Sequence, residues 1–546
     1  MKKWKKISLL STAVILVGAL SACSSSSGSS SRNPSFSLPV DISTLDQSLV
    51  TDQYSYTIVG TTQEGLTRVD SSGQPANALA KSIDVSKDGL TYTVVLRDGL
   101  KWSNGDALTA KDFVYSWQRG VNPDTASQYA YLMGVVKNAN DINSGKITDL
   151  SQLGIKAESS TKLVITLEAP TPYFKYLLGQ AIFMPENQKV VEKYGKQYGT
   201  SSDKMVYNGP FKFTSKNPWS GNNKSFSVVK NPAYYDASSV KASGLDFQTI
   251  SQPTTAVALY KQGKLDLAFL TTPSLVSANK SNAGFKTFVQ ARTDYIEYNQ
   301  TGKVKALTNQ KIREALNLAT DRKGAINVAT PGSKVASSLS PSGLAKTPTG
   351  EDFATYAKQG YTYDPAKAKT LFAEGLKELG VTSLSLSFEY ASDQPVATAF
   401  ATYLQQSLQS NLPGLKLSLK GVPFKQRLND QQVANFDIVL ASWGGDYAEP
   451  STFLQMFLTG GSYNDGKFSS KEFDTAYQKA STTPDVLNPT ALYEDYKACE
   501  TALYQGSYIN PVDFQSSPAL LNPKIQGLQF VSTGLNYDFK NVELKK

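Results

Sequence analysis

The segment Phe436-Asp-Ile-Val-Leu-Ala-Ser-Trp443 runs directly into Gly444-Gly-Asp-Tyr-Ala-Glu-Pro450. The first segment is mostly apolar with aromatic ends, which predicts a buried strand, and the two glycines allow a tight turn and the close approach of a ligand. Ligands of open α/β sheets bind beyond the carboxyl ends of the strands, so we expect Asp446 to hold a cationic group beside Trp443 and Tyr447. An aspartate here can equally cap the helix that follows Pro450, and both interpretations stay open.

The segments before this stretch extend the α/β pattern. Alternating apolar residues predict strands at 383–390 and 415–419, and the apolar periodicity of 395–412 predicts a long amphipathic helix between them. A short helix near Gln426 then leads to the strand that ends at Trp443. The order strand, helix, strand, helix, strand predicts a parallel α/β unit with right-handed crossovers.

The amino-terminal half has a different pattern. The pairs Asp88-Gly89 and Asp98-Gly99 lie on either side of an alternating segment at 90–96, which predicts a β-hairpin. Thr109 precedes an amphipathic segment at 110–119 and predicts a capped helix there.

Length and composition limit the possible functions. A chain of 546 residues is too long for one core, so we expect two or three domains. The chain has no histidine, which excludes Ser-His-Asp and Cys-His catalysis and histidine-ligated zinc or haem. It also lacks a phosphate-binding GxxxxGK[ST] loop and a GxSxG nucleophile elbow. We therefore expect neither an enzyme nor a protein with a cofactor or bound metal.

The amino terminus has the features of an export signal. Four lysines within residues 2–6 precede an apolar run at 7–20, and Leu20-Ser-Ala-Cys23 follows. This segment resembles the lipobox of bacterial lipoproteins, which implies lipidation of Cys23 after removal of residues 1–22. An ordinary signal peptide or an uncleaved anchor is the alternative. The serine-rich residues that follow, within 23–33, predict a flexible tether.

The mature chain offers little charge and no disulfide. Residues 1–22 contain four of the 55 basic residues and none of the 46 acidic ones, so the remainder has a net charge of +5. These basic residues are scattered, and we expect no nucleic-acid partner. Cys499 is then the one cysteine beyond Cys23, and its surroundings predict a half-buried position on a helix.

Four separate segments resemble one family, the peptide-binding solute-binding proteins of ABC importers. The first comprises residues 90–106 with Thr109-Ala-Lys-Asp-Phe113, and the second is Val206-Tyr-Asn-Gly-Pro-Phe211. The third is the helix-like 311–322. The fourth, Trp443 to Leu454, is similar to the family's Trp-x-x-Asp-Tyr motif.

The resemblance implies an α/β, two-lobed periplasmic-binding-protein-like fold with an extra domain inserted in the first lobe. Carried over by position, lobe I comprises 34–65, 195–297 and 512–546. The inserted domain is 66–194, and lobe II is 298–511.

The resemblance also implies binding residues. In the family, the aspartate of the Trp-x-x-Asp motif pairs with the peptide's α-ammonium, which corresponds to Asp446. Residues of the crossing into lobe II are candidates for contacts with the peptide main chain, and a tyrosine after 125–127 matches a contact on the inserted domain. Half-buried or core positions are the alternatives. The candidate peptide-binding residues are Asp446, Trp443, Tyr447, Gly445, Asn299, Glu297, Tyr295 and Tyr129.

One feature departs from the family. Some relatives bind the peptide's terminal carboxylate with basic residues of lobe II, where this chain has Leu440, Gln431 and Pro395. We therefore expect either tolerance of longer peptides or a carboxylate bound by lysines elsewhere.

Together these features predict a monomeric receptor, lipid-anchored on the extracytoplasmic face of the membrane of a Gram-positive-like cell, that binds oligopeptides between closing lobes and delivers them to an ABC importer. A same-fold receptor for a peptide pheromone or a sugar, and a surface hydrolase or adhesion protein, are the alternatives. Pairing of Asp446 with a peptide amine predicts an affinity that is flat below about pH 7 and falls above about pH 8.

Overall fold

The computed structural model describes residues 32–461, 463–533 and 537–545. The predicted signal sequence and Cys23 lie outside these residues. Within them, no helix has the length and apolar character needed to cross a membrane.

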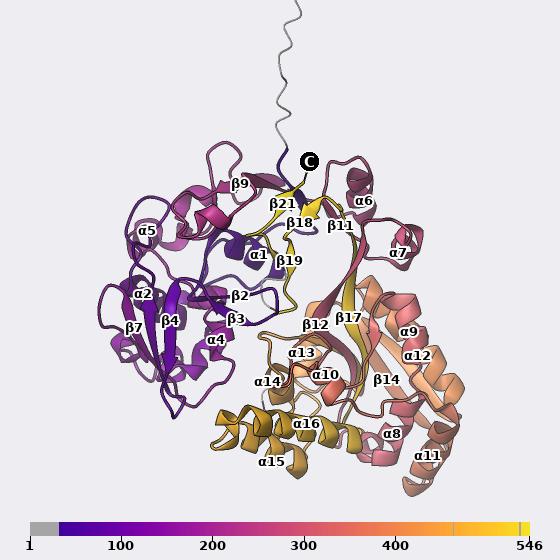
Figure 1. The fold of residues 1–546 in the computed structure, drawn as a ribbon. Helices are drawn as coiled ribbons and strands as arrows, with labels where there is room; N and C mark the ends of the chain where they lie inside the picture. Colours follow the sequence, from indigo (N-terminus) through magenta and orange to yellow (C-terminus); the bar gives the residue numbers. More distant parts are fainter. Residues whose placement is uncertain (1–31, 462, 534–536, 546) are drawn as a thin grey trace, which may run out of the picture. The chain divides into compact units, whose positions relative to one another are not determined.

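The largest sheet contains eleven strands, two of which are long and lie side by side (Figure 1). These are β12 (Phe285–Tyr298) and β17 (Ile509–Leu521), which pair antiparallel with irregularities in register between Val289 and Thr293 and between Asp294 and Tyr295. The other strands of the sheet are β1 (Ser35–Leu38), β8 (Phe211–Phe213), β9 (Ser225–Lys230), β10 (Gly244–Thr249), β11 (Leu267–Phe269), β13 (Lys334–Val335), β14 (Leu384–Ala391), β15 (Leu415–Val422) and β16 (Ile438–Gly444). Because β16 pairs with β12 and β11 with β17, the two long strands join one set of strands to the other.

The predicted parallel α/β unit is confirmed. Strand β14 pairs parallel with both β15 and β16. Helix α12 (Pro395–Asn411) links β14 to β15, and α13 (Phe424–Gln432) links β15 to β16. Apolar side chains of the strands and of α12, among them Phe388, Leu404 and Ile438, are buried together, so the alternation in the sequence reports burial against this helix layer.

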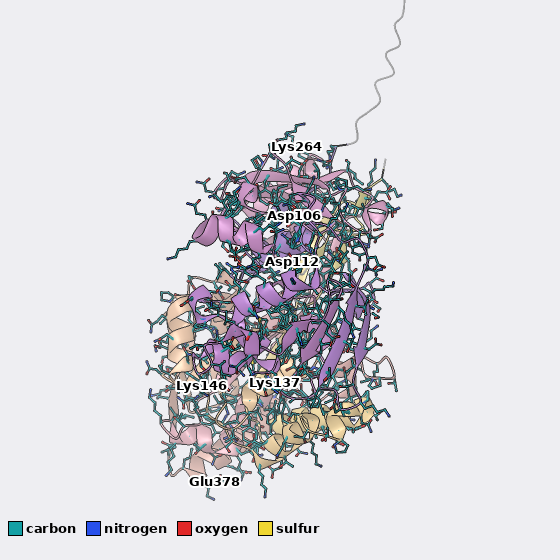
Figure 2. All side chains as sticks on the ribbon, turned by 90° about the vertical axis from the view of Figure 1, so that its left-hand side faces the viewer. Asp106, Asp112, Lys137, Lys146, Lys264 and Glu378 are labelled. Atoms are coloured by element: carbon teal, nitrogen blue, oxygen red, sulfur yellow. The ribbon has the colours of Figure 1, made fainter. Side chains whose placement is uncertain are left out.

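A second sheet of four antiparallel strands has the order β4 (Ala80–Val85), β5 (Thr91–Leu96), β7 (Lys162–Thr166), β6 (Ile155–Ala157). The predicted hairpin is β4–β5, whose turn contains Gly89 at φ +72°. The predicted capped helix is α2 (Ala110–Val121). The backbone N–H of Thr109 donates over 2.8 Å to Oδ2 of Asp112, which lies in the first turn of this helix and is labelled in Figure 2.

The remaining longer helices support these sheets. They are α1 (Gln53–Thr62), α5 (Gln188–Tyr194), α6 (Pro253–Lys261), α7 (Pro273–Asn279), α8 (Gln310–Ala319), α9 (Arg322–Ala329), α11 (Pro365–Glu378), α15 (Lys471–Ala480) and α16 (Pro489–Gln505). The helix-like segment 311–322 is divided between α8 and α9, because Asp321 caps a new helix by accepting from the N–H of Gly324. Cys499 lies on α16 as expected, but it is fully buried rather than half-buried.

The buried apolar side chains form several separate clusters. One surrounds the four-stranded sheet with Trp102 and Trp117, a second includes Phe36 and Phe211, a third covers β14–β16, and a fourth lies around α15 and α16. Separate clusters are what a chain of this length requires. The exact limits of the two lobes and of the inserted domain stay a prediction.

Candidate functional site

Asp446 lies two residues beyond the end of β16. Gly444 is the last residue of that strand and pairs with Arg292 of β12. The N–H of Gly445 donates to the carbonyl of Ala291 over 2.8 Å, and the N–H of Asp446 donates to Thr452 Oγ1 over 3.0 Å. The turn is thus bonded on both sides, which fixes the position of Asp446.

Gly445 is needed for close packing at this turn. A Cβ atom at this residue would lie 3.0 Å from a side-chain carbon of Leu344 and 3.2 Å from carbons of Phe453 and Thr452. The sequence predicts that the glycines allow close approach of a ligand. In the structure, the groups that approach Gly445 closely are side chains of the protein itself.

The carboxylate of Asp446 does not cap the next helix. In α14 (Ser451–Leu454), the N–H of Ser451 donates instead to Glu449 Oε2 over 2.9 Å. Burial raises the pKa of Asp446 to about 6, and a hydrogen bond from Tyr131 opposes the rise. Its Oδ2 atom has no hydrogen-bond partner among the described residues. A buried carboxylate oxygen without a partner is costly, so the site has capacity for a cationic donor.

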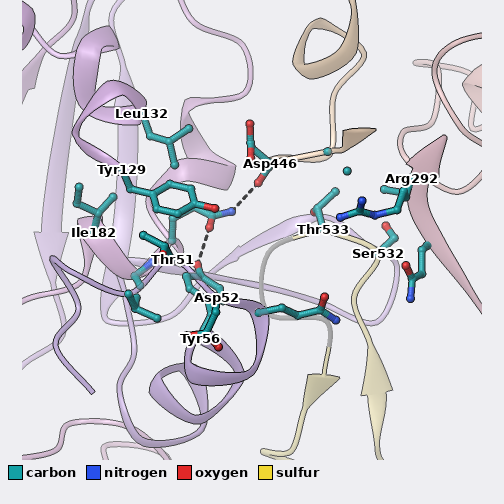
Figure 3. Close-up of a pocket in the computed structure, with 18 residues that line it drawn as sticks. Thr51, Asp52, Tyr56, Tyr129, Leu132, Ile182, Arg292, Asp446, Ser532 and Thr533 are labelled. Carbon is teal, nitrogen blue, oxygen red and sulfur yellow. Dashed lines mark hydrogen bonds between the residues drawn. The ribbon is translucent and has the colours of Figure 1, made fainter. Parts of the chain in front are cut away.

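Asp446 lies in the wall of a cavity of about 270 Å³ (Figure 3). The cavity is bordered by the start of α1, by β12, by the turn after β16, and by segments near positions 130, 181 and 532. Its lining residues are Val50, Thr51, Asp52, Gln53, Tyr56, Tyr129, Leu132, Gln180, Ala181, Ile182, Gln290, Ala291, Arg292, Gly444, Gly445, Asp446, Ser532 and Thr533. Of the predicted set, Asp446, Gly445 and Tyr129 are brought together here.

Gln180 connects two walls of the cavity. Its Nε2 atom donates to the backbone carbonyl of Asp446 over 2.9 Å, and its Oε1 accepts from the Tyr56 hydroxyl over 2.5 Å. Figure 3 shows both bonds as dashed lines. The turn that carries Asp446 is therefore bonded to a segment more than 260 positions earlier in the chain.

Two ionic side chains of the cavity differ in how they are used. Asp52 caps α1 by accepting from the N–H groups of Tyr54 and Ser55 over 3.1 and 2.8 Å, and it also accepts from the Ser43 hydroxyl. Arg292 donates from Nη1 to Ser442 Oγ over 3.0 Å. The carboxylate of Asp52 thus accepts several hydrogen bonds from nearby residues, whereas the guanidinium of Arg292 donates one hydrogen bond to a described residue.

Trp443 and Tyr447 contact other parts of the protein. The indole Nε1 of Trp443 donates to the carbonyl of Thr452 over 2.9 Å. The ring of Tyr447 is buried and stacks on Tyr173, with 3.9 Å between centroids and 5° between planes. Neither residue is part of the cavity lining, so contact of either with a ligand stays a prediction.

The side chains of Tyr295, Glu297 and Asn299 are buried away from the cavity lining. Asn299 Nδ2 donates to the carbonyls of Ala434 and Phe436 over 2.9 and 2.7 Å. Glu297 accepts from the N–H of Gly466 and from Gln431 Nε2, each over 2.7 Å, and burial raises its pKa to about 7. These side chains hold β12 in place, and a contact with a peptide main chain stays a prediction.

The sequence did not point to the other lining residues, among them the polar side chains Asp52, Tyr56, Gln180 and Arg292. Asp52 carried a signal, because an aspartate before a helix-like stretch predicts a cap at that point. Arg292 carried a weaker one, as one of two cations in β12, the other being Lys286. Nothing local marks Tyr56 or Gln180, since their places depend on packing between distant segments.

In the part of the chain that the structure describes, no group of three or more Cys, Asp and Glu side chains is arranged to hold a metal ion.

Comparison with known proteins agrees with this arrangement. The model of "Bacterial extracellular solute-binding proteins, family 5 Middle" matches residues 74–465. A "Dipeptide-binding protein" of Lactococcus lactis subsp. cremoris is 62% identical over 550 aligned positions, covering 100% of both chains. The "Oligopeptide-binding protein OppA" of Bacillus subtilis is 31% identical, also over 100% of both chains.

A solved structure, "Listeria monocytogenes OppA bound to peptide", has a TM-score of 0.75 at 35% identity and covers 94% of this chain and 99% of that one. The predicted fold class and the family resemblance are therefore confirmed. The chain belongs to the bacterial extracellular solute-binding proteins of family 5, which are binding proteins and not enzymes.

Proposed function

We propose that this protein is a peptide-binding receptor of an ABC importer and that it takes peptides with a free amino terminus into the cavity beside Asp446. One observation carries the proposal: a buried carboxylate with an unpartnered oxygen lines a cavity in a protein of this family. A peptide α-ammonium is a cationic donor of the right chemistry. Pairing it with Asp446 inside the cavity satisfies both groups where water is scarce.

The size of the cavity favours short peptides. Its volume of about 270 Å³ lies just below the range of about 300 to 1,000 Å³ that is usual for small-molecule pockets. The name of the Lactococcus relative, "Dipeptide-binding protein", supports the same size class. We therefore propose dipeptides and tripeptides as ligands, in place of the wider range of oligopeptides that the sequence alone predicted.

The cavity lies where all three predicted domains meet. Asp446 belongs to the proposed lobe II, Arg292 and Ser532 to the proposed lobe I, and Tyr129 and Gln180 to the proposed inserted domain. A ligand held by residues of all three stabilises the closed arrangement over an open one. The Gln180 bond to Asp446 and the stack of Tyr173 on Tyr447 cross the same boundary and support closure.

A length series of peptides tests the proposal. Calorimetry with di-, tri- and pentapeptides of alanine is expected to give tight binding for the first two and weaker binding for the third. Galactose and maltose serve as controls for the sugar alternative. Binding of a sugar with no binding of any peptide would reject the proposal, and equal affinity for all three lengths would reject the size class.

We also propose that the protein is anchored by lipid on Cys23 at the extracytoplasmic face of the membrane. The support is the Leu20-Ser-Ala-Cys23 sequence and the extracellular description of the family. Substitution of Cys23→Ala is expected to release the protein into the medium with its peptide affinity unchanged. Cell fractionation with immunodetection measures this, and full retention of the variant on the membrane would argue against the anchor.

A further inference from the structure

The cavity carries two charged groups that the protein leaves incompletely paired, and they have opposite sign. Its acidic lining residues are Asp52, which is occupied by capping bonds, and Asp446. Its one basic lining residue within the described chain is Arg292. A short peptide with free ends carries an ammonium and a carboxylate, so it matches both groups at once.

We propose that Arg292 binds the C-terminal carboxylate of the short peptide whose α-ammonium pairs with Asp446. This inference rests on the proposed peptide-binding function and adds the group that recognises the other end of the ligand. It makes the receptor selective for peptides that fit between the two charges.

The bonding of Arg292 leaves it free to take a ligand. Arg68 and Arg119 each form ion pairs with carboxylates, whereas Arg292 forms none with the described residues. A guanidinium has five N–H donors, and one of those of Arg292 bonds to Ser442. The others remain for a planar acceptor, and a carboxylate can accept two parallel bonds from such a group.

Gly444 makes room for this guanidinium. A Cβ atom at Gly444 would lie 3.2 Å from Nη2 of Arg292, closer than ordinary contact, so the side chain lies against the bare backbone of β16. Figure 3 shows the guanidinium turned toward the side of the cavity where Asp446 lies. The bond to Ser442 holds it in that direction.

The alternative basic residues are less suitable. Some relatives use lobe II positions that are Leu440, Gln431 and Pro395 here, none of which carries a charge. Arg427 lies near two of them, but it is buried, donates to Gln431 Oε1 over 2.6 Å and is not part of the cavity lining. Arg292 approaches from β12 instead, on the other side of the turn.

The size of the cavity favours a short ligand. Asp446 and Arg292 line the same cavity, whose volume is about 270 Å³. A ligand that meets both charged groups inside this volume is a short peptide.

The test uses the dipeptide Ala-Ala in three forms: free, N-acetylated and C-amidated. Calorimetry with the wild-type protein is expected to show a loss of roughly 10- to 100-fold on amidation, the range for a charge-assisted hydrogen-bonded contact. In Arg292→Gln, the free and amidated forms are expected to bind equally well. Glutamine keeps a donor for Ser442, so the local fold is preserved.

Two further variants serve as controls. Lys286→Gln removes a positive charge from an exposed position of the same strand and is expected to keep full discrimination against the amide. Asp446→Asn is expected to lose discrimination against the N-acetyl form while it still distinguishes free from amidated carboxylate. Retained discrimination against the N-acetyl form in Arg292→Gln shows that this variant is folded and binds in the same cavity.

The outcomes separate this inference from the proposed function. If wild-type protein binds no form of the dipeptide, the proposed function itself fails. If it binds the free and amidated forms equally but rejects the N-acetyl form, the function stands and the role of Arg292 is wrong. Discrimination against the amide that survives in Arg292→Gln overturns the assignment as well, because another group must then bind the carboxylate.

Discussion

At the scale of single residues, the proposed ion pair between Asp446 and a peptide amine makes binding depend on the charge state of Asp446. Burial raises the pKa of this carboxyl group to about 6, whereas the amine of a free peptide titrates at about 7.7 to 8.0. The ion pair requires Asp446 without its proton and the amine with one. Both conditions hold between these two values.

We therefore predict a bell-shaped dependence of peptide affinity on pH. Below about pH 6 the empty site is protonated and binding must expel that proton, so affinity falls as pH decreases. Above about pH 8 the amine loses its charge and affinity falls again. This changes the expectation from sequence of a flat profile below pH 7, which did not include burial of Asp446. Calorimetry between pH 5 and pH 9 measures it, and a flat acid limb would contradict it.

Asp446 also permits a double-mutant cycle with the ligand. Removing one partner of a buried ion pair leaves the other uncompensated, at a cost of roughly 3–5 kcal/mol. Asp446→Ala and N-acetylation of the peptide are each expected to have this effect, and the two together to cost less than their sum. The cycle needs four titrations at pH 7. Strict additivity would mean that the two groups do not touch.

The sequence was sufficient to place Asp446 beyond the end of a strand and not sufficient to find the other residues that line its cavity. A buried strand followed by two glycines is a local pattern, and it placed this carboxylate correctly at the end of β16. Gln180 and Arg292 reach the same cavity through the packing of distant segments and the pairing of β12 with β16. Neither is encoded by the residues next to them.

At the scale of elements, β12 shows why a correctly expected strand does not give the site. The family resemblance implies that this segment crosses between the lobes, with Tyr295, Glu297 and, just after the strand, Asn299 as candidate contacts. Their side chains are buried, whereas Arg292 lines the cavity. Alternation along a strand predicts two faces, but the tertiary structure decides which one a ligand meets.

The two long strands also carry a pair of facing carboxyl groups. Asp294 of β12 lies directly opposite Asp513 of β17, and both are buried. Gln515 Nε2 donates to Asp294 over 2.8 Å, and the Thr330 hydroxyl donates to Asp513 over 2.7 Å. Burial raises the pKa of both groups, and the charge of Asp294 raises that of Asp513 further. In the folded protein, the state in which the two carboxyl groups retain a proton is therefore favoured over the state in which both are ionised.

This pair predicts a stability that decreases with rising pH. A carboxyl group whose pKa is raised in the folded state contributes its full stabilisation of the fold below the pKa of the unfolded chain, about 3.9. This contribution is lost as the pH rises through the pKa of the folded state. Asp513→Asn keeps the shape and the donor without the ionisation, so its melting temperature should exceed that of the wild type at pH 8 and approach it at pH 4. Asp98→Asn, at an exposed site, is the control and should show neither effect.

At the scale of the whole molecule, the proposed closure predicts that peptide binding makes the protein more compact. Small-angle scattering is expected to give a smaller radius of gyration in the presence of Ala-Ala. Tyr173→Ala removes the stack on Tyr447 without altering the cavity lining, so it should weaken affinity by about 0.5–1.5 kcal/mol.

Tyr363→Ala, at an exposed ring, is the matched control for this experiment and should change neither the radius nor the affinity. Tight binding with an unchanged radius in the wild-type protein would mean that the lobes do not move.

The packing around Gly445 has a consequence for how such receptors diversify. Any side chain at this residue would press on Leu344, Phe453 and Thr452, so the turn tolerates little drift. The turn that carries Asp446, the proposed anchor for the peptide amine, is thereby preorganised before a ligand binds. Changes of preference over evolutionary time must then arise at the surrounding walls, where Tyr129, Leu132 and Ile182 can vary one at a time. A descendant protein could thus bind peptides with different side chains while it keeps the proposed contact between Asp446 and the peptide amine.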